Sequence, residues 1–174
     1  MVDLYSVLDA AGVRYRRFDH APVFTCDDAY AALPNEPAVQ TKNLFLRDKR
    51  GRRHALLVTS CEKAVDIKRF AKQIDADHLS FASAERMMTY LGVTPGSVTV
   101  LGLINDPEHA VELYVDADVW RAEAWRCHPL INSATLVIAR QDVEKLLAHT
   151  GHTARVVTLE SRDARTVDAS DRST

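Results

Sequence analysis

The stretch HPLINSAT at residues 128–135 joins a rigid polar corner to an apolar, strand-like run that continues to Ala139. Pro129 removes a backbone N–H donor, fixes its own φ and biases His128 towards an extended conformation. His128 is therefore presented at a rigid corner, next to a carboxamide and two hydroxyls. The pattern leaves two interpretations open: a turn whose polar side chains satisfy nearby backbone groups, or one wall of a ligand site.

Length and composition predict one globular domain. The chain has 174 residues, of which 47% are hydrophobic and 26% are charged, enough to build a full core. The formal net charge is −2, so contact with nucleic acid requires a local basic patch. No apolar run approaches membrane-spanning length, and residues 1–11 lack the apolar core of a signal peptide. We therefore expect a cytoplasmic protein without membrane contact.

Apolar periodicity and turn residues predict helices mixed with strands. The expected helices cover residues 2–11, 25–33, 66–74, 83–91 and 142–149. The expected strands cover residues 13–18, 39–47, 54–59, 98–104, 111–115, 134–139 and 155–159. Strands that neighbour one another as well as alternate with helices favour a single α+β domain with a mixed sheet. Residues 160–174 have almost nothing to bury, and we expect a mobile polar tail there.

Two further stretches combine polar groups with special backbone features. Lys42 and Asn43 begin an apolar strand, and they mark either a solvated strand entrance or the mouth of a cleft that holds an anion or a carbonyl oxygen. The sequence TPGS at residues 94–97 must be a turn. Gly96 either completes that turn only or lets the backbone approach a ligand closely. Neither glycine spacing typical of nucleotide binding is present.

The cysteines and histidines indicate neither a nucleophile nor a metal site. Cys26, Cys61 and Cys127 cannot all pair within one chain and lack metal-ligand spacing, which fits a reducing compartment. We expect core or surface thiols, since Cys127 and His128 are neighbours on a strand and point to opposite faces. The seven histidines form no H-x-x-x-H pair, so no metal and no cofactor are expected.

Basic side chains cluster at residues 14–17, 47–53 and 63–72. Solvated faces are the default explanation for such clusters. If they meet in space beside Lys42, they instead form a rim that follows the phosphates of a nucleic acid.

Five motifs, in this order, resemble the YbaK/ProX family and are most similar to its freestanding Ala-tRNA(Pro) deacylases of the ProXp-ala/PrdX type. The motifs are KNLFLRD at 42–48, LSFAS at 79–83, LGVTPGSVT at 91–99, LIND at 103–106 and HPLIN at 128–132. The resemblance implies an aminoacyl-tRNA editing domain over residues 1–159, built on a mixed, partly barrel-like sheet surrounded by helices.

The implied activity is hydrolysis of the ester that joins a mischarged amino acid to the terminal ribose of tRNA, with Ala-tRNA(Pro) as the expected substrate. The expected catalytic residues are Lys42 and Gly96. Substrate binding is expected from Asn43, Ser97, His128 and Asn132, with His128 limiting the size of the amino-acid pocket. Contacts with tRNA are expected from Arg47, Lys63, Lys68 and Arg69, and prolyl-tRNA synthetase is a candidate partner.

One departure and two alternatives accompany this assignment. Val100 stands where the family loop usually ends in proline, so we expect a less rigid loop there. The alternatives are a deacylase for another small mischarged amino acid, such as Cys-tRNA(Pro), and a module that binds a tRNA end or a small molecule without hydrolysis. The presence of Lys42, Gly96 and His128 argues against the binding module, and the hydrolase assignment requires these three residues to converge on a single crevice.

Overall fold

A long antiparallel hairpin runs through the centre of the molecule. The computed structural model describes residues 2–33 and 35–162, and in it β2 (Val39–Asp48) pairs with β3 (His54–Ser60) over seven residue pairs, from Thr41↔Ser60 to Arg47↔His54. The carboxylate of Asp48 accepts the backbone N–H groups of Arg52 and Arg53 at 2.8 and 3.1 Å, which closes the connecting turn. The predicted hairpin is therefore present, with a side-chain cap that holds its turn.

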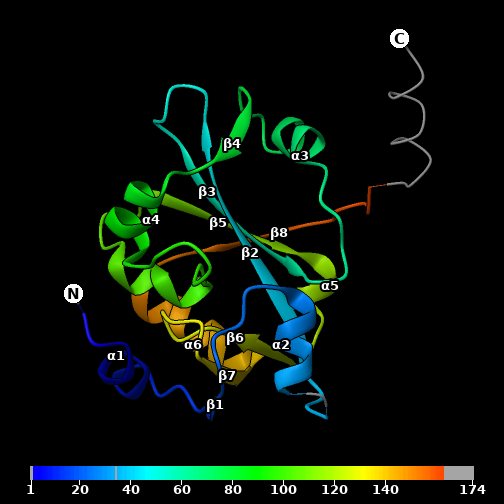
Figure 1. Cartoon of the computed structure of the whole chain (residues 1–174). Coiled ribbons are helices and arrows are strands. Elements are labelled where there is room, and N and C mark those ends of the chain that lie inside the picture. The colour runs from blue at the N-terminus through cyan, green and yellow to red at the C-terminus, as the bar shows by residue number, and fades with distance from the viewer. Residues whose placement is uncertain (1, 34, 163–174) are drawn as a thin grey trace.

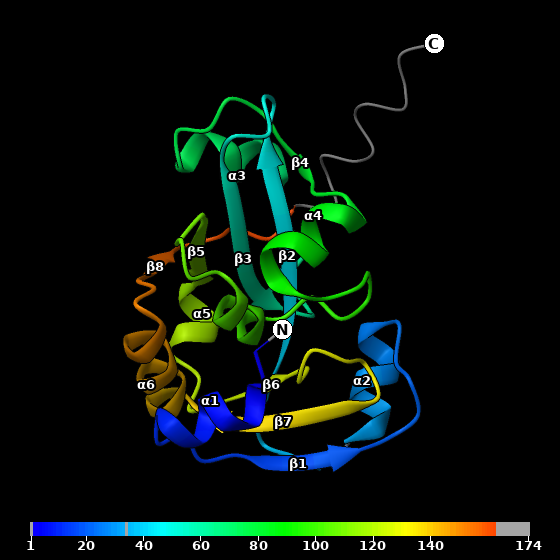
Figure 2. The same cartoon turned by 90° about the vertical axis from the view of Figure 1, so that its left-hand side faces the viewer.

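The hairpin is the middle of an eight-stranded mixed sheet in the order β1-β7-β6-β2-β3-β5-β8, with β4 beside β2. The remaining strands are β1 (Arg16–Asp19), β4 (Leu79–Phe81), β5 (Val111–Asp116), β6 (Ala124–Cys127), β7 (Ala134–Ala139) and β8 (Ala154–Val157). The pairs β2–β6, β3–β5 and β5–β8 are parallel, and the others are antiparallel. The α+β class with a mixed sheet is confirmed, and the sheet is open, with β1 and β8 at its edges. Figures 1 and 2 show β1 and β7 crossing below the lower end of the hairpin.

The helices lie around this sheet, and α2, α3 and α4 begin directly after the capping residues that the sequence predicts. They are α1 (Leu4–Ala10), α2 (Cys26–Ala32), α3 (Ile67–Gln73), α4 (Ala84–Leu91), α5 (Ala117–Trp120) and α6 (Arg140–Thr150). The side chains of Thr25, Asp66 and Ser83 accept a backbone N–H three residues onward and cap α2, α3 and α4. Gly92 and Gly151 end α4 and α6 in the left-handed conformation.

The prediction of a strand over residues 98–104 is wrong. This segment forms a 3₁₀-helix, η1 (Val100–Asn105), whose first turn is capped by the Thr99 hydroxyl at 3.2 Å from the Leu101 N–H. Every residue from Val100 to Ile104 is buried, and a continuous buried apolar run of this length does not distinguish strand from helix by periodicity. The short elements β4, β6 and α5 were also not predicted.

Two clusters of buried side chains cover the two faces of β3. Leu56 and Val58 pack into the larger cluster, while Ala55 and Leu57 pack into a smaller one with Phe70 of α3. This alternation buries the hairpin on both sides and fixes the register of β2. None of the described helices is long and apolar enough to cross a membrane. Most of the predicted mobile tail, residues 163–174, lies outside the described residues.

Candidate active site

One pocket gathers four of the predicted site residues. Lys42 and Asn43 from β2, Gly96 from the turn after α4, and His128 from the corner after β6 all line a cavity of about 260 Å³. The wall is completed by residues 23–26 at the start of α2, by Gln40 and by Cys61. Side chains that lie up to 86 positions apart in the sequence, counting from Lys42 to His128, therefore share one crevice.

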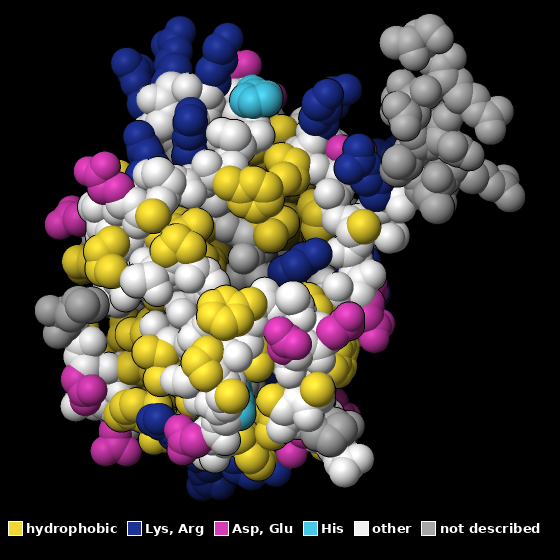
Figure 3. All heavy atoms as spheres, in the orientation of Figure 1, with side chains coloured by type: hydrophobic (Ala, Val, Ile, Leu, Met, Phe, Trp, Pro, Cys, Tyr) yellow, Lys and Arg dark blue, Asp and Glu magenta, His cyan; other side chains and the backbone are white. Residues whose placement is uncertain are grey.

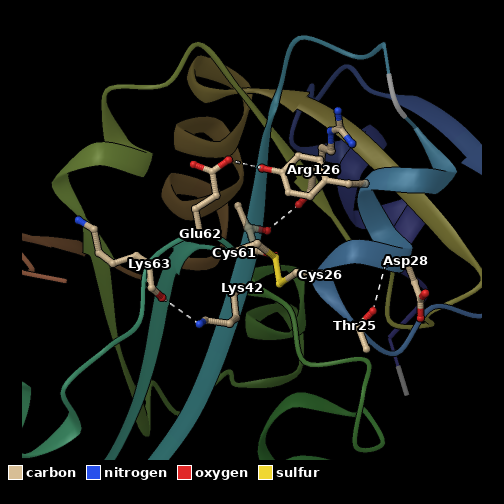
Figure 4. The surroundings of a disulfide bond; sticks show 10 residues. Thr25, Cys26, Asp28, Lys42, Cys61, Glu62, Lys63 and Arg126 are labelled. Carbon is tan, nitrogen blue, oxygen red and sulfur yellow. Dashed lines mark hydrogen bonds between the residues drawn. A yellow bond between two sulfur atoms is a disulfide. The ribbon is translucent and has the colours of Figure 1, made fainter. Parts of the chain in front are cut away.

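Lys42 projects from the part of β2 nearest α2, opposite Thr59 of β3. Its Nζ donates to the backbone oxygen of Lys63 at 3.0 Å (Figure 4). Partial burial of the ammonium lowers the pKa of Lys42 from its usual value. A cation that is partly desolvated and tethered at one N–H interacts more strongly with negative charge in the pocket than a solvated lysine does.

Two carboxamide oxygens in the pocket wall are buried without a partner. The Oε1 of Gln40 and the Oδ1 of Asn43 have no hydrogen-bond donor among the described residues, although the Gln40 residue is only 4% exposed. A buried acceptor left unpaired costs about 1–3 kcal/mol, and both residues also line the pocket. Sequence reasoning missed Gln40. The sequence feature that could have revealed Gln40 is its carboxamide, which directly precedes the polar residues 41–43 at the start of an otherwise apolar strand.

Gly96 occupies a turn that requires a residue without a side chain. Ser97 N donates to the oxygen of Thr94 at 3.1 Å, and Gly96 has a φ of +90°, as expected for the third position of a Pro-Gly turn. The N–H of Gly96 has no acceptor within the described part of the chain. Gly96 thus lines the pocket and carries a backbone donor without a described partner, while the Ser97 residue is 4% exposed and lies outside the pocket lining.

His128 follows β6 directly and contacts its own loop. Its Nδ1 lies 3.3 Å from the oxygen of Ala134, which assigns the proton to Nδ1 and leaves Nε2 as an acceptor. Burial lowers the pKa of His128, so the ring is neutral at neutral pH. Cys127 points into the core on the opposite side, as the alternation along a strand predicts.

Asn132 contacts the pocket indirectly, through hydrogen bonds to Val23 in the pocket wall. Its Nδ2 donates to the oxygen of Val23 at 3.1 Å, and its own backbone oxygen accepts the Val23 N–H at 3.1 Å. This double contact holds the segment that enters α2, where Val23 and the 78% exposed Phe24 line the pocket. Asn132 itself is outside the lining and is a positioning residue.

The four predicted tRNA-contact residues do not meet at this pocket. Lys63 pairs with Asp116 at 2.7 Å and Asp118 at 2.8 Å, and its side chain is only 13% exposed, so it is not available to a phosphate. Arg69 on α3 pairs with Glu160, while Lys68 beside it is exposed. Arg47 lies five residues along β2 from Lys42, about 16 Å at the rise of a strand.

A basic surface lies at the tip of the hairpin. Lys49, Arg50 and Arg52 are exposed there. Figure 3 shows Lys and Arg side chains gathered over the end of the molecule where the β2–β3 turn lies in Figure 1.

The expectation of unpaired cysteines is wrong for two of the three. Cys26, the first residue of α2, forms a disulfide with Cys61, which follows β3 (Figure 4). Their Cα atoms are 5.7 Å apart although 35 positions separate them in the sequence, and no local pattern reveals such an approach. Cys127 is free and buried, as expected.

An open mixed sheet with a polar, partly desolvated crevice beside its central hairpin defines a small α+β domain with one candidate site. The model for the aminoacyl-tRNA editing domain matches residues 20–146. The chain therefore belongs to the aminoacyl-tRNA editing domain family, and it is a hydrolase that acts on the ester bond of an aminoacyl-tRNA.

Individual relatives agree with this assignment. The prolyl-tRNA editing protein ProX of Acetoanaerobium sticklandii is 34% identical over 152 residues, covering 87% of this chain and 93% of that protein. Prolyl-tRNA synthetase associated domain-containing protein 1 of Danio rerio is 28% identical over 91% of this chain and 86% of that protein. A crystal structure of a candidate trans-editing enzyme for prolyl tRNA synthetase shares the fold, with a TM-score of 0.71 at 20% identity over 92% of this chain and 96% of that chain.

Proposed function

We propose that this protein hydrolyses Ala-tRNA(Pro) in trans, releasing alanine from tRNA that prolyl-tRNA synthetase has mischarged. The observation that carries the proposal is the convergence of Lys42, Gly96 and His128 on one pocket. Support for proline tRNA comes from the relative named as a prolyl-tRNA editing protein. We also propose a cytoplasmic location, because tRNA is charged there.

The chemistry needs only a modest contribution from the protein, because an aminoacyl ester is already reactive. Water adds to the carbonyl carbon, and the bond between that carbon and the ribose oxygen breaks. The ribose oxygen takes a proton from the attacking water, which leaves free alanine and uncharged tRNA. In this mechanism the unpaired N–H of Gly96 holds the carbonyl oxygen of the ester, and the Lys42 ammonium offsets the negative charge that develops on that oxygen.

The unpaired acceptors explain how the amino acid is oriented. An aminoacyl ester carries a free ammonium group with three N–H donors, and the unpaired oxygens Gln40 Oε1 and Asn43 Oδ1 belong to two residues that line the pocket, where a rotation of either side chain would bring its oxygen to this ammonium. Binding of the ammonium would remove the cost of leaving these oxygens unpaired. The two carboxamides therefore select for an amino acid and fix the direction of its side chain.

Selection by size falls to His128 and its corner. An apolar pocket distinguishes substrates by only about 1–3 kcal/mol per methylene, so attraction alone separates alanine poorly from proline. The His128 ring is fixed by Pro129 and by its contact with Ala134, and a fixed ring excludes a larger side chain sterically.

The body of the tRNA requires a basic surface outside the pocket. We assign this contact to Arg47, Lys68 and Arg69 together with the exposed cations of the hairpin tip, and not to Lys63. Binding through phosphates is expected to weaken with salt. We further propose prolyl-tRNA synthetase as a partner, which sedimentation of the mixed proteins with and without tRNA would test.

The deciding experiment is a deacylation panel with Ala-, Cys-, Ser- and Pro-tRNA(Pro). We expect rapid release of alanine and retention of proline. Preferential hydrolysis of Cys-tRNA(Pro) would show that the protein is a deacylase whose substrate carries cysteine instead of alanine. Binding of these tRNAs without any hydrolysis would overturn the proposal.

A further inference from the structure

The wall of the pocket contains a disulfide that the hydrolysis does not use. Cys26 and Cys61 both line the cavity, beside Lys42 (Figure 4). Both cysteines are half-buried, so a small thiol can reach them from the open side of the pocket. Membership of an aminoacyl-tRNA editing family adds weight, because disulfides in the cytoplasm are usually transient, catalytic or redox-sensing.

Helix α2 has few other anchors. Of its seven residues only Ala29 is buried. The remaining contacts are polar or peripheral: Tyr30 Oη donates to Glu62 at 3.3 Å, and the Arg126 guanidinium lies 5.5 Å from the centre of the Tyr30 ring. The disulfide is therefore a covalent tether of the first turn of α2, next to the segment that the two Asn132–Val23 hydrogen bonds hold.

The other half of the disulfide is joined to the strand that carries the catalytic lysine. The N–H of Cys61 donates to the backbone oxygen of Gln40 at 2.9 Å, two residues before Lys42. The bond thus links α2 on one side of the pocket to β2 on the other. Breaking it frees the wall made by α2 to move relative to Lys42 and Gln40.

We propose that Cys26 and Cys61 form a reversible thiol–disulfide site that sets how strictly the pocket selects its amino acid by size. The effect on amino-acid selection rests on the proposed function, whereas the thiol–disulfide exchange itself does not. In the oxidised protein the first turn of α2 is held against the pocket, which stays narrow. In the reduced protein α2 moves away and larger amino acids enter.

The exchange uses a small thiol or a protein dithiol as the reductant. A thiolate of the reductant attacks one sulfur, the Cys26–Cys61 bond breaks, and a mixed disulfide forms while the other cysteine leaves as a thiolate and takes a proton. A second reductant thiol then releases the mixed disulfide. The net result is two cysteine thiols and one reductant disulfide, so two electrons pass to the protein.

The third cysteine does not interfere with this exchange. Cys127 is buried in the core, and burial raises the pKa of its thiol to about 12. A thiol that stays protonated is a poor nucleophile, so Cys127 does not attack the disulfide. It therefore provides an internal control.

The exchange is tested first without substrate. Folded full-length protein is equilibrated with reduced or oxidised glutathione, and its free thiols are then alkylated. The number of alkylated cysteines is read from the protein mass by mass spectrometry. We expect no alkylated cysteine in the oxidised protein and two in the reduced protein. Amide hydrogen exchange of residues 24–33 should be faster in the reduced protein, with no change in β3 and β5. An unchanged alkylation pattern or unchanged exchange in residues 24–33 would overturn the proposal, whatever the protein hydrolyses.

Selection is tested on the same two forms. We expect the ratio of Ala-tRNA(Pro) to Pro-tRNA(Pro) hydrolysis to fall about tenfold on reduction, the scale of one methylene in a pocket. Cys26→Ser and Cys61→Ser should show the reduced ratio under both conditions, whereas Cys127→Ala should respond as the wild type does. Equal ratios in both redox forms would refute the effect on selection. Absence of all hydrolysis would instead refute the proposed function and leave the exchange result standing.

Discussion

The Nζ of Lys42 donates to the backbone oxygen of Lys63 at 3.0 Å, which joins the lysine of β2 to the segment that follows the disulfide. An ammonium has three N–H donors, and this contact uses one of them. The side chain is thereby directed along the pocket wall with further donors available to a ligand.

Replacement of Lys42 tests its part in the reaction. Lys42→Met keeps most of the apolar stem and removes the charge, so we expect deacylation to fall about 100-fold or more, as for the loss of one group that stabilises an oxyanion. Single-turnover rates with saturating enzyme would measure this. Lys42→Arg serves as the charge-retaining control, and an unaltered rate in Lys42→Met would remove Lys42 from the mechanism.

Gly96→Ala separates backbone strain from steric blockage. A Cβ at this position would meet only Asn132 Nδ2, at 3.9 Å, so it has room, but the φ of +90° costs a side-chain-bearing residue about 1–2 kcal/mol. We expect a loss of stability on that scale and a strong loss of deacylation as the turn adjusts.

Gly12→Ala is the matched control for this variant, since Gly12 has a φ of +71° with nothing within 4 Å. Urea unfolding should show comparable destabilisation in both proteins, with activity lost only in Gly96→Ala. Equal activities in the two variants would show that the turn at Gly96 does not take part.

His128→Ala should relax the exclusion of larger amino acids. Removing the ring opens the pocket, and we expect the preference for alanine over proline to fall by about 10–200-fold, the range associated with one methylene. Competition between Ala-tRNA(Pro) and Pro-tRNA(Pro) measures the ratio directly. A preference equal to that of the wild type would assign size selection to another part of the wall.

The burial of His128 also predicts a dependence of stability on pH. Its folded pKa is lowered, so the folded protein binds this proton less readily than the unfolded chain does. The contribution of His128 to stability is complete above the unfolded value of about 6.5 and declines as the pH falls below it. Urea unfolding of the wild type and His128→Gln at several pH values would reveal a larger acid-induced loss in the wild type; parallel curves would contradict the assignment.

The disulfide should contribute to stability as well as to the pocket. It closes a loop with a sequence separation of 35, for which the chain-entropy model gives about 3–4 kcal/mol. Denaturant unfolding of oxidised and reduced Cys127→Ala, which carries only the Cys26–Cys61 pair, would measure this difference. A difference near zero would show that the bond does not constrain the unfolded chain as expected.

Local features of this fold were predictable because they depend on neighbouring residues. Thr25, Asp66 and Ser83 cap helices through their own next turn, and Gly92 ends a helix because a left-handed φ suits glycine. The hairpin of residues 39–60 follows from two apolar runs and a polar turn. The grouping of Lys42, Gly96 and His128 was predictable only from motifs in a familiar order, since spacing alone did not relate them.

The features that sequence reasoning missed depend on contacts between distant segments. Lys63 carries the same charge as its exposed neighbours, but Asp116 and Asp118, more than 50 positions away, remove it from the basic surface. Contacts between distant segments also account for the η1 helix, the buried oxygen of Gln40 and the Cys26–Cys61 bond. The amino-acid sequence alone decides where α2, α3 and α4 begin and where α4 ends, because those capping interactions act within one turn of the chain. Tertiary structure decides which polar groups are neutralised, which are left unpaired and which sulfurs meet, because each outcome depends on a partner that packing brings from elsewhere.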